Sequence, residues 1–328
     1  MRKWVAPLFG ALFTTLPAFA QDLILIDGSS TVFPITSAIA KEFEYEEKGQ
    51  TKVLVGITGT GGGFKKFCRG TQDIANASRP IKDKEKRLCE SNGVEFIELP
   101  IALDAVTVVV NKENNWADSL SVEELKTIWQ PKSEGVINKW QQINSDFPPS
   151  LLTLYGPGED SGTYDYFTEA IVGEGGASRK DYHANEDDNV IAAGVAKDIN
   201  SMAFFGMAYY EENKDKLKAV SVSWKGKPAV EATLETTKSG VYQPLSRPIF
   251  IYVNKKSADK FAYVRRFINL YLNVNRVPKI IKHAGYVPLP DEIYKALKNG
   301  FEERQTGSRF NGPEIGLGIE ELMERVPE

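Results

Sequence analysis

Three turns rich in Gly, Ser and Thr each connect a short apolar run to a helix-like run. They lie at residues 27–31 (DGSST), 56–63 (GITGTGGG) and 156–163 (GPGEDSGT). A helix that begins at such a turn exposes unpaired backbone N–H groups and the positive end of its dipole, and both attract anions. Glycine lets the backbone approach a ligand closely. Helix capping alone explains one turn of this kind, but three on one chain predict convergence on a small oxyanion.

Short apolar runs alternate with amphipathic helical patterns along most of the chain. The runs LILIDG, KVLVGITG, VEFIELP and AVTVVVN have the length and residue types of strands. This alternation is typical of an α/β protein, in which helices cover a parallel or mixed sheet and ligands bind at the carboxyl ends of strands. Helices are predicted at 34–48, 62–68, 82–89, 121–129, 161–171, 189–198, 257–271, 278–283 and 290–298.

The first 20 residues predict export. They begin with MRK, continue with an apolar stretch that two prolines interrupt, and end with AFA, which fits the small-x-small cleavage rule of signal peptides. The alternative is a single membrane anchor, but the apolar stretch is short for a membrane span. Because Gln21 rather than Cys follows the expected cut, no lipid anchor is predicted.

The charge balance argues against nucleic acid as a partner. Loss of the leader removes two of the 40 Lys and Arg residues and none of the 44 Asp and Glu residues, so 38 against 44 leaves a net charge of −6. Nucleic-acid binding requires a basic face. An acidic protein that binds an anion must therefore do so through local groups.

Cys68 and Cys89 are the only cysteines of the chain. In an oxidising compartment, this spacing predicts a disulfide, with two buried free thiols as the alternative. The two histidines, His183 and His283, lie 100 positions apart and have no cluster of metal ligands beside them. Neither a metal site nor a cofactor is therefore expected.

Two extended segments resemble each other. LDAVTVVVNK at 103–112 and RPIFIYVNK at 247–255 are both rich in β-branched residues and end in Val-Asn-Lys. Two such strands could cross between two lobes, one outward and one returning. They could equally be ordinary core strands, and the residues leave both alternatives open.

Eight segments carry a family resemblance when they are taken in order: DGSSTVFPIT, GITGTGGGFKKFC, DIANASRPIKDKEK, ELPIALDAVTVVVN, LYGPGEDSGTYDYFTEAI, FFGMAYYEEN, PLSRPIFIYVN and GYVPLP. They resemble the PstS family, the periplasmic solute receptors of phosphate ABC importers. The resemblance implies the two-lobed periplasmic-binding-protein fold of type II, with a mixed sheet flanked by helices in each lobe and two crossing strands between them. Lobe one would comprise 21–105 and 247–328, and lobe two would comprise 106–246.

The resemblance also implies a function. We expect a soluble, exported monomer that binds inorganic phosphate in the periplasm and delivers it to the membrane permease subunits of an ABC importer. No catalytic activity is expected. The phosphate ligands implied by the family pattern are the hydroxyl of Ser30, the amide of Thr31, the hydroxyls of Thr60, Ser161 and Thr163 and the amide of Gly162, with Gly61 as a less certain member.

Two positions depart from the best-known version of the family. Arg79 stands where an aspartate follows the Ala-Ser of lobe one, and Pro157 stands where an arginine precedes the Ser-Gly-Thr of lobe two. Because a guanidinium donates parallel hydrogen bonds to oxyanions, Arg79 is predicted to be the cation of the site. The alternative is a solvated surface arginine.

The missing aspartate requires another acceptor for the proton that phosphate keeps at neutral pH. Asp160 is the nearest candidate, although its position also suits a helix N-cap. Glu159 and the acidic run 186–188 are weaker candidates, since such a run is more often the solvated start of a helix.

Two other functions remain open from the residues alone. A receptor for another tetrahedral oxyanion, such as sulfate, would use the same turns. A secreted phosphate-ester hydrolase would need Ser161 as nucleophile, but the chain has no Gly-x-Ser-x-Gly elbow and no GxxxxGK[ST] loop. It also shows no recognisable base for such a nucleophile.

Overall fold

Two strands run through the middle of the molecule and pair antiparallel: β4 (Phe96–Asn111) and β11 (Ser246–Asn254). The computed structural model describes residues 21–310 and 314–326, so the predicted leader at 1–20 lies outside the described residues. Every residue of β4 and β11 is buried. Their pairing shifts register between Ile249 and Phe250, opposite the segment of β4 that contains Pro100.

The remaining strands extend the sheet on both sides of this pair. On one side β11 pairs antiparallel with β3 (Ile74–Ala77), which is followed by the parallel strands β1 (Asp22–Gly28) and β2 (Thr51–Val55). On the other side β4 pairs antiparallel with β8 (Ser201–Gly206), and the parallel strands β6 (Thr153–Pro157) and β7 (His183–Asn185) follow. Two short strands, β9 (Leu217–Ala219) and β12 (Val287–Pro288), also pair with β4, while β5 (Ser119–Ser121) and β10 (Ser221–Ser223) form a separate pair.

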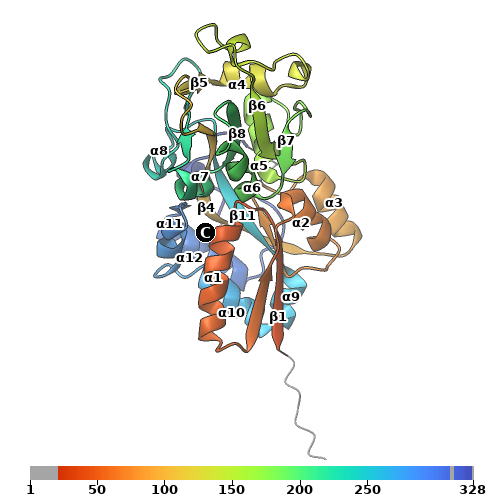
Figure 1. Ribbon diagram of the computed structural model, residues 1–328. Coiled ribbons are helices and arrows are strands. Elements are labelled where there is room, and N and C mark those ends of the chain that lie inside the picture. The colour runs from red at the N-terminus through yellow and green to blue at the C-terminus, as the bar shows by residue number, and fades with distance from the viewer. Residues whose placement is uncertain (1–20, 311–313, 327–328) are drawn as a thin grey trace, which may run out of the picture.

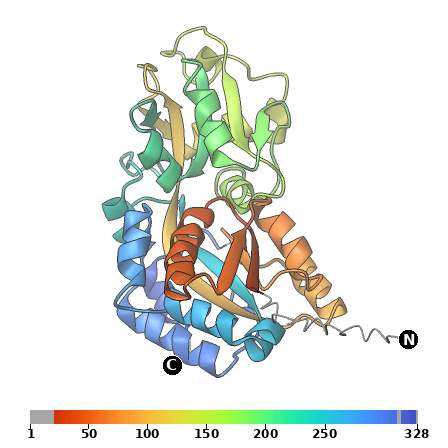
Figure 2. The same ribbon diagram turned by 60° about the horizontal axis from the view of Figure 1, so that its bottom comes forward.

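The buried side chains form separate cores on the two sides. One core draws on residues 24–103 and 249–322, with Ala208 as its single member from elsewhere. The others draw on residues 105–245. We call the elements around the first core lobe one and those around the others lobe two. The lobes lie at opposite ends of an elongated molecule, and β4 runs from one into the other (Figure 1 and Figure 2).

Helices cover the sheet in both lobes. Those of lobe one are α1 (Phe33–Glu46), α2 (Gly59–Phe67), α3 (Asp83–Ser91), α9 (Lys255–Lys260), α10 (Ala262–Tyr271), α11 (Val277–His283), α12 (Asp291–Glu302) and α13 (Ile319–Met323). Those of lobe two are α4 (Val122–Trp129), α5 (Gly162–Val172), α6 (Asp188–Val195), α7 (Met207–Asn213) and α8 (Leu234–Lys238), with single 3-10 turns at Pro131–Ser133 and Trp140–Gln142.

Most predicted helices are present with ends shifted by a few residues. The segment 257–271, predicted as one helix, forms the separate helices α9 and α10, because Phe261 between them has extended backbone angles (φ −111°, ψ 115°). The runs at 94–100 and 105–111, predicted as two strands, belong to the single strand β4. The short helices α7, α8 and α13 were not predicted.

A disulfide ties α2 to α3. Cys68, at the end of α2, is bonded to Cys89 of α3, which confirms the predicted pair. Within the described residues, none of the helices combines the length and the apolar composition needed to cross a bilayer.

Candidate anion-binding site

Two of the three predicted turns meet where the lobes face each other. The turn after β1 leads into α1 of lobe one, and the turn after β6 leads into α5 of lobe two. Thr31 Oγ1 of the first turn lies 3.0 Å from Thr163 Oγ1 of the other, and both residues are buried. The hydroxyls of two segments that are remote in sequence therefore share one water-excluded place.

The turn after β2 joins the same place from a second direction. Thr60 Oγ1 lies 3.2 Å from Ser78 Oγ and accepts a hydrogen bond from the backbone N–H of Ser78. A Cβ on Gly162 would lie 2.5 Å from Thr60 Oγ1 and 2.6 Å from Ser78 Oγ. The absence of a side chain at Gly162 thus lets the first turn of α5 approach the lobe-one hydroxyls.

Arg247 supplies a positive charge from the crossing strand β11. It faces Asp104 of β4, and its Nε and Nη2 donate to Asp104 Oδ2 at 3.1 and 2.9 Å. The same Nη2 donates to Thr163 Oγ1 at 2.8 Å, and Nη1 donates to the carbonyl of Gly162 at 3.3 Å. Arg247 and Asp104 are almost fully buried, so the cation lies in a low-dielectric region beside the hydroxyls.

Asp188 brings a carboxylate from lobe two to the lobe-one turn. It is the first residue of α6, and its Oδ2 accepts a hydrogen bond from Ser30 Oγ at 3.2 Å. Its Oδ1 is buried and has no hydrogen-bond partner among the described residues. Burial raises the pKa of Asp188 to about 7. A carboxylate with one unpaired buried oxygen is poised to accept a hydrogen bond from a ligand that carries a proton.

A second acidic residue of the same loop lies at the boundary between the lobes. Burial, with a smaller contribution from the nearby Asp160 carboxylate, raises the pKa of Glu186 to about 7. A Cβ on Gly59, the first residue of α2, would lie 2.8 Å from Glu186 Oε2. The loop before α6 therefore packs against the start of α2.

Two tyrosines fix the backbone of the lobe-one turn. Tyr209 of α7 donates its hydroxyl hydrogen to the carbonyl of Ser30 at 2.8 Å, and Tyr286 donates to the carbonyl of Thr31. The first of these hydrogen bonds joins lobe two to lobe one. The backbone of this turn, which carries the Ser30 and Thr31 side chains, is thereby held from both lobes.

Arg79 has partners other than the predicted ones. Its Nη1 and Nη2 donate to the two carboxylate oxygens of Glu85 at 2.8 Å each, and its Nε donates to Asp165 at 2.7 Å. Burial lowers the pKa of Arg79, but the carboxylates of Glu85 and Asp165 outweigh this effect and raise it above its ordinary value. Arg79 is thus neither a solvated arginine nor a partner of the Thr31–Thr163 pair, and Arg247 has that position.

Asp160 also has a different environment from the one predicted. Its carboxylate pairs with Lys65 at 2.7 Å in a partly exposed position, and its carbonyl accepts the N–H of Gly61 at 2.7 Å. The N-cap of α5 is Ser161, whose Oγ accepts the N–H groups of Thr163 and Tyr164. The N–H of Gly61 and the Oγ of Ser161 are therefore already hydrogen-bonded within the protein.

Sequence reasoning missed Arg247 and Asp104 and ranked Asp188 low. Both missed residues lie in the two segments that end in Val-Asn-Lys. The hypothesis that these segments are strands crossing between the lobes could therefore have pointed to them as charged residues at the boundary. Asp188 stands in an acidic run that a solvated helix start would explain equally well. Within residues 21–310 and 314–326, no group of His, Cys, Asp and Glu side chains is arranged to hold a metal ion.

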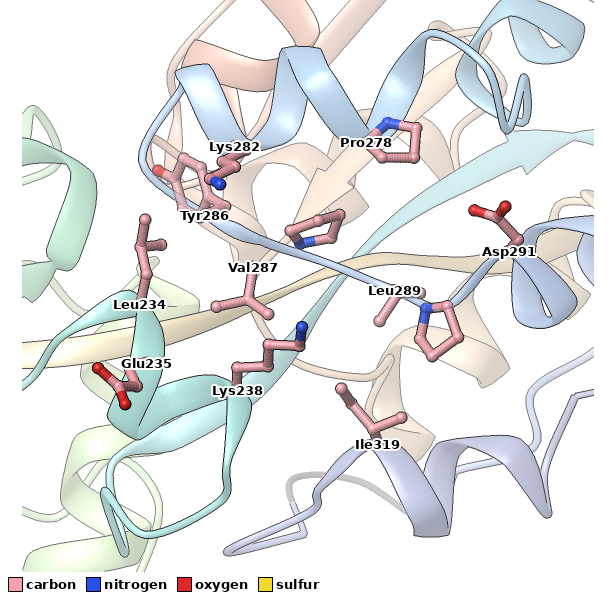
Figure 3. A pocket seen from close by; sticks show the side chains of 12 residues that line it. Leu234, Glu235, Lys238, Pro278, Lys282, Tyr286, Val287, Leu289, Asp291 and Ile319 are labelled. Carbon is pink, nitrogen blue, oxygen red and sulfur yellow. The ribbon is translucent and has the colours of Figure 1, made fainter.

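A separate groove lies between the lobes beside the crossing strands. It measures about 610 Å³ and contains side chains of α8 from lobe two, such as Leu234 and Lys238, opposite Val287, Leu289 and Ile319 of lobe one. Figure 3 shows these side chains around the groove. Tyr286, whose hydroxyl donates to the carbonyl of Thr31, also lines the groove. The side chains of Ser30, Thr31, Thr163, Arg247 and Asp188 do not line it, so the groove lies beside the anion site and does not contain it.

Two lobes that enclose a buried site at crossing strands define a solute receptor of the periplasmic-binding-protein class. Residues 14–273 match the family model for a PBP superfamily domain. Protein SphX of Synechocystis sp. is 47% identical to this chain over 310 residues, which cover 94% of this chain and 91% of SphX.

The phosphate-binding protein PstS of Staphylococcus saprophyticus is 39% identical over 277 residues, with 84% of this chain and 83% of that protein covered. The crystal structure of a possible phosphate binding protein from Planctomyces limnophilus is 38% identical, with a TM-score of 0.62 and coverage of 86% of this chain and 98% of that one. The chain belongs to the PBP superfamily and, within it, to the family of PstS phosphate-binding proteins. The predicted family and fold class are confirmed.

Proposed function

We propose that this chain binds inorganic phosphate between its lobes in the periplasm and delivers it to the permease of an ABC importer. One observation carries the proposal: hydroxyls of both lobes, the guanidinium of Arg247 and the unpaired carboxylate oxygen of Asp188 lie at one buried boundary. Relatives that are named phosphate-binding proteins support the same ligand.

The hydroxyls act as the donors to the phosphate oxygens. Thr31 and Thr163 contact each other directly, so a ligand must take over their hydrogen bonds, and the lobes must separate to admit it. Closure then excludes water and strengthens each hydrogen bond to the anion. Micromolar binding corresponds to about −8 kcal/mol, and several charge-assisted bonds of about 1.5–3 kcal/mol each supply this after ordering costs.

Arg247 recognises the negative charge of phosphate, and Asp188 recognises its proton. Arg247 provides the positive charge, and Asp104 on the neighbouring strand fixes its orientation. Asp188 accepts the hydrogen of a protonated phosphate through its unpaired oxygen. Sulfate has no such hydrogen at neutral pH and would place a negative oxygen against the carboxylate. This role replaces the one predicted for Asp160.

We propose a binding role without catalysis, for an exported monomer. Ser161, the only nucleophile that the sequence suggested, caps α5, and its described hydrogen bonds come from backbone N–H groups rather than from a base. Export rests on the predicted leader and on the membership of the chain in a family of periplasmic receptors.

Calorimetric titration of the phosphate-stripped mature protein tests this function. Phosphate, arsenate and sulfate are titrated separately between about pH 5 and 8.5. We expect tight binding of phosphate and arsenate and no measurable binding of sulfate. A protein that binds none of these anions would refute the function, and equal binding of sulfate and phosphate would make it a receptor for tetrahedral oxyanions in general.

A further inference from the structure

We propose that Asp165 holds the closed form together through a buried ion pair between the lobes and thereby sets the lifetime of the bound state. The proposal rests on the proposed function, since it concerns closure around the same ligand. Asp165 lies in α5, two residues after Thr163, and its carboxylate points at lobe one.

Both carboxylate oxygens of Asp165 contact cations of the other lobe. Oδ2 lies 2.7 Å from Arg79 Nε, and Oδ1 lies 2.8 Å from Lys82 Nζ. The side chains of Arg79 and Asp165 are only 2% and 8% exposed, so solvent screens their attraction little. The exposed pair between Lys65 and Asp160 also joins the lobes, but pairs of that kind contribute little.

Lobe one keeps Arg79 paired whether or not lobe two is present. Glu85 accepts two hydrogen bonds from the guanidinium, and its Oε2 also accepts the N–H of Lys82 at 2.8 Å. Arg79, Lys82 and Glu85 together carry one net positive charge that faces lobe two. Separation of the lobes therefore leaves no bare arginine in lobe one. Of the ion pairs that Arg79 makes, it breaks the one with Asp165 and keeps the one with Glu85.

The helix α5 couples this ion pair to the ligand. Gly162 and Thr163 form its first turn at the anion site, and Asp165 follows within the same turn. The motion that brings Thr163 to Thr31 therefore also brings Asp165 to Arg79. Stabilising the closed form in this way raises ligand affinity without any contact between Asp165 and the ligand, and the effect falls mainly on dissociation. Asp165 is thus a positioning residue.

Stopped-flow kinetics with inorganic phosphate on the full mature protein test the proposal. For Asp165→Asn we expect dissociation to be at least about tenfold faster, with association changed less than about threefold. Lys82→Met removes one contact from the lobe-one side and should speed dissociation to a smaller extent. The matched control is Asp181→Asn, which removes the carboxylate partner of Arg179 within lobe two and should leave both rates near those of the wild type.

Small-angle scattering of the ligand-free proteins provides a measurement that does not depend on phosphate. We expect Asp165→Asn and Lys82→Met to have a larger radius of gyration than the wild type and Asp181→Asn. Unchanged dissociation rates in both variants, or unchanged scattering, would overturn the role of Asp165 even if the wild type binds phosphate tightly. A wild type that binds no phosphate would instead refute the function, and the scattering comparison would still decide whether the ion pair closes the lobes.

Discussion

Arg247 and Asp104 face each other across the crossing strands β11 and β4, and two N–H groups of the guanidinium donate to one oxygen of the carboxylate. This pairing aims the rest of the guanidinium at Thr163 and Gly162 of lobe two. The cation of the candidate anion site therefore lies on a strand that joins the lobes, and α5 of lobe two contacts it there.

Arg247→Lys should lower phosphate affinity by at least about tenfold, because a lysine keeps the charge but loses the fork that contacts Asp104 and Thr163 together. Calorimetry measures the affinity, and thermal unfolding checks that the variant is folded. Arg179→Lys is a suitable control, since Arg179 is also buried but pairs with Asp181 within lobe two. Wild-type affinity in Arg247→Lys would remove Arg247 from the site.

Asp188→Asn should weaken the discrimination between phosphate and sulfate. The asparagine amide can donate to an unprotonated oxygen that the carboxylate would repel, so sulfate should bind measurably while phosphate binds less tightly. Competition between the two anions in calorimetry measures the ratio. Asp160→Asn serves as the control, because Asp160 pairs with Lys65 at the partly exposed rim, and its selectivity should match the wild type. If Asp160→Asn lost selectivity and Asp188→Asn kept it, Asp160 rather than Asp188 would accept the phosphate proton.

The stability of the ligand-free protein should depend on the ionisation of Asp188. Its pKa in the folded protein is about 7, above the ordinary value of 3.8. Between these values the folded protein holds a proton that the unfolded chain has released, so the free energy of unfolding falls as the pH rises through this window. Asp188→Asn cannot ionise and should lose less stability over the same range.

Thermal unfolding of the ligand-free wild type and Asp188→Asn at pH 5 and pH 8 checks this expectation. The pKa of Glu186 is also raised, to about 7, and contributes a slope of the same sign to both proteins. The difference between the two proteins therefore isolates Asp188. Parallel losses of stability in both would show that Asp188 does not titrate in this range.

Gly162→Ala should prevent full closure. The added Cβ would lie 2.5 Å from Thr60 Oγ1 and 2.6 Å from Ser78 Oγ, both in lobe one, so α5 cannot keep its place against them. We expect a loss of phosphate affinity of about a hundredfold, which corresponds to roughly 3 kcal/mol, with each lobe still folded. In the control Gly175→Ala, the nearest atom to the new Cβ is the end of the Glu169 side chain within lobe two, and affinity should be nearly unchanged. Equal affinities in the two variants would contradict the close approach at Gly162.

Tyr209→Phe should weaken phosphate binding about fivefold, because it removes one hydrogen bond from lobe two to the carbonyl of Ser30, worth about 1 kcal/mol. Tyr294→Phe removes two hydrogen bonds of a buried tyrosine within lobe one, one donated to the carbonyl of Ile101 and one accepted from the N–H of Leu289. This control should lose stability without a matching loss of affinity. The same change of affinity in both variants would mean that Tyr209 has no special role in closure.

Local patterns along the chain were enough to predict several features of this protein. The helices that start at Gly-rich and hydroxyl-rich turns, the α/β class and the Cys68–Cys89 pair depend on residues near each other in sequence or on the redox compartment. Convergence of the Gly- and hydroxyl-rich turns was predicted from their common design, and the family resemblance implied that Thr31 and Thr163 bind one anion. The structure places the hydroxyls of these two residues 3.0 Å apart. The residue boundaries of the two lobes remain a prediction.

Only the tertiary structure decided which charged groups face the anion site. Arg79 and Arg247 each precede a proline, and the sequence pointed to the first as the cation. In the structure, Glu85 and Asp165 surround Arg79. The β4–β11 register places Asp104 beside Arg247, and α5 brings Thr163 to it. The sequence around Asp188 fits the solvated start of a helix, but in the structure Asp188 is buried against Ser30 of lobe one. Helix capping and strand formation depend on residues close together in sequence. Burial and ion pairing depend on segments from both lobes that come together only in the tertiary structure, so a short stretch of sequence cannot predict them.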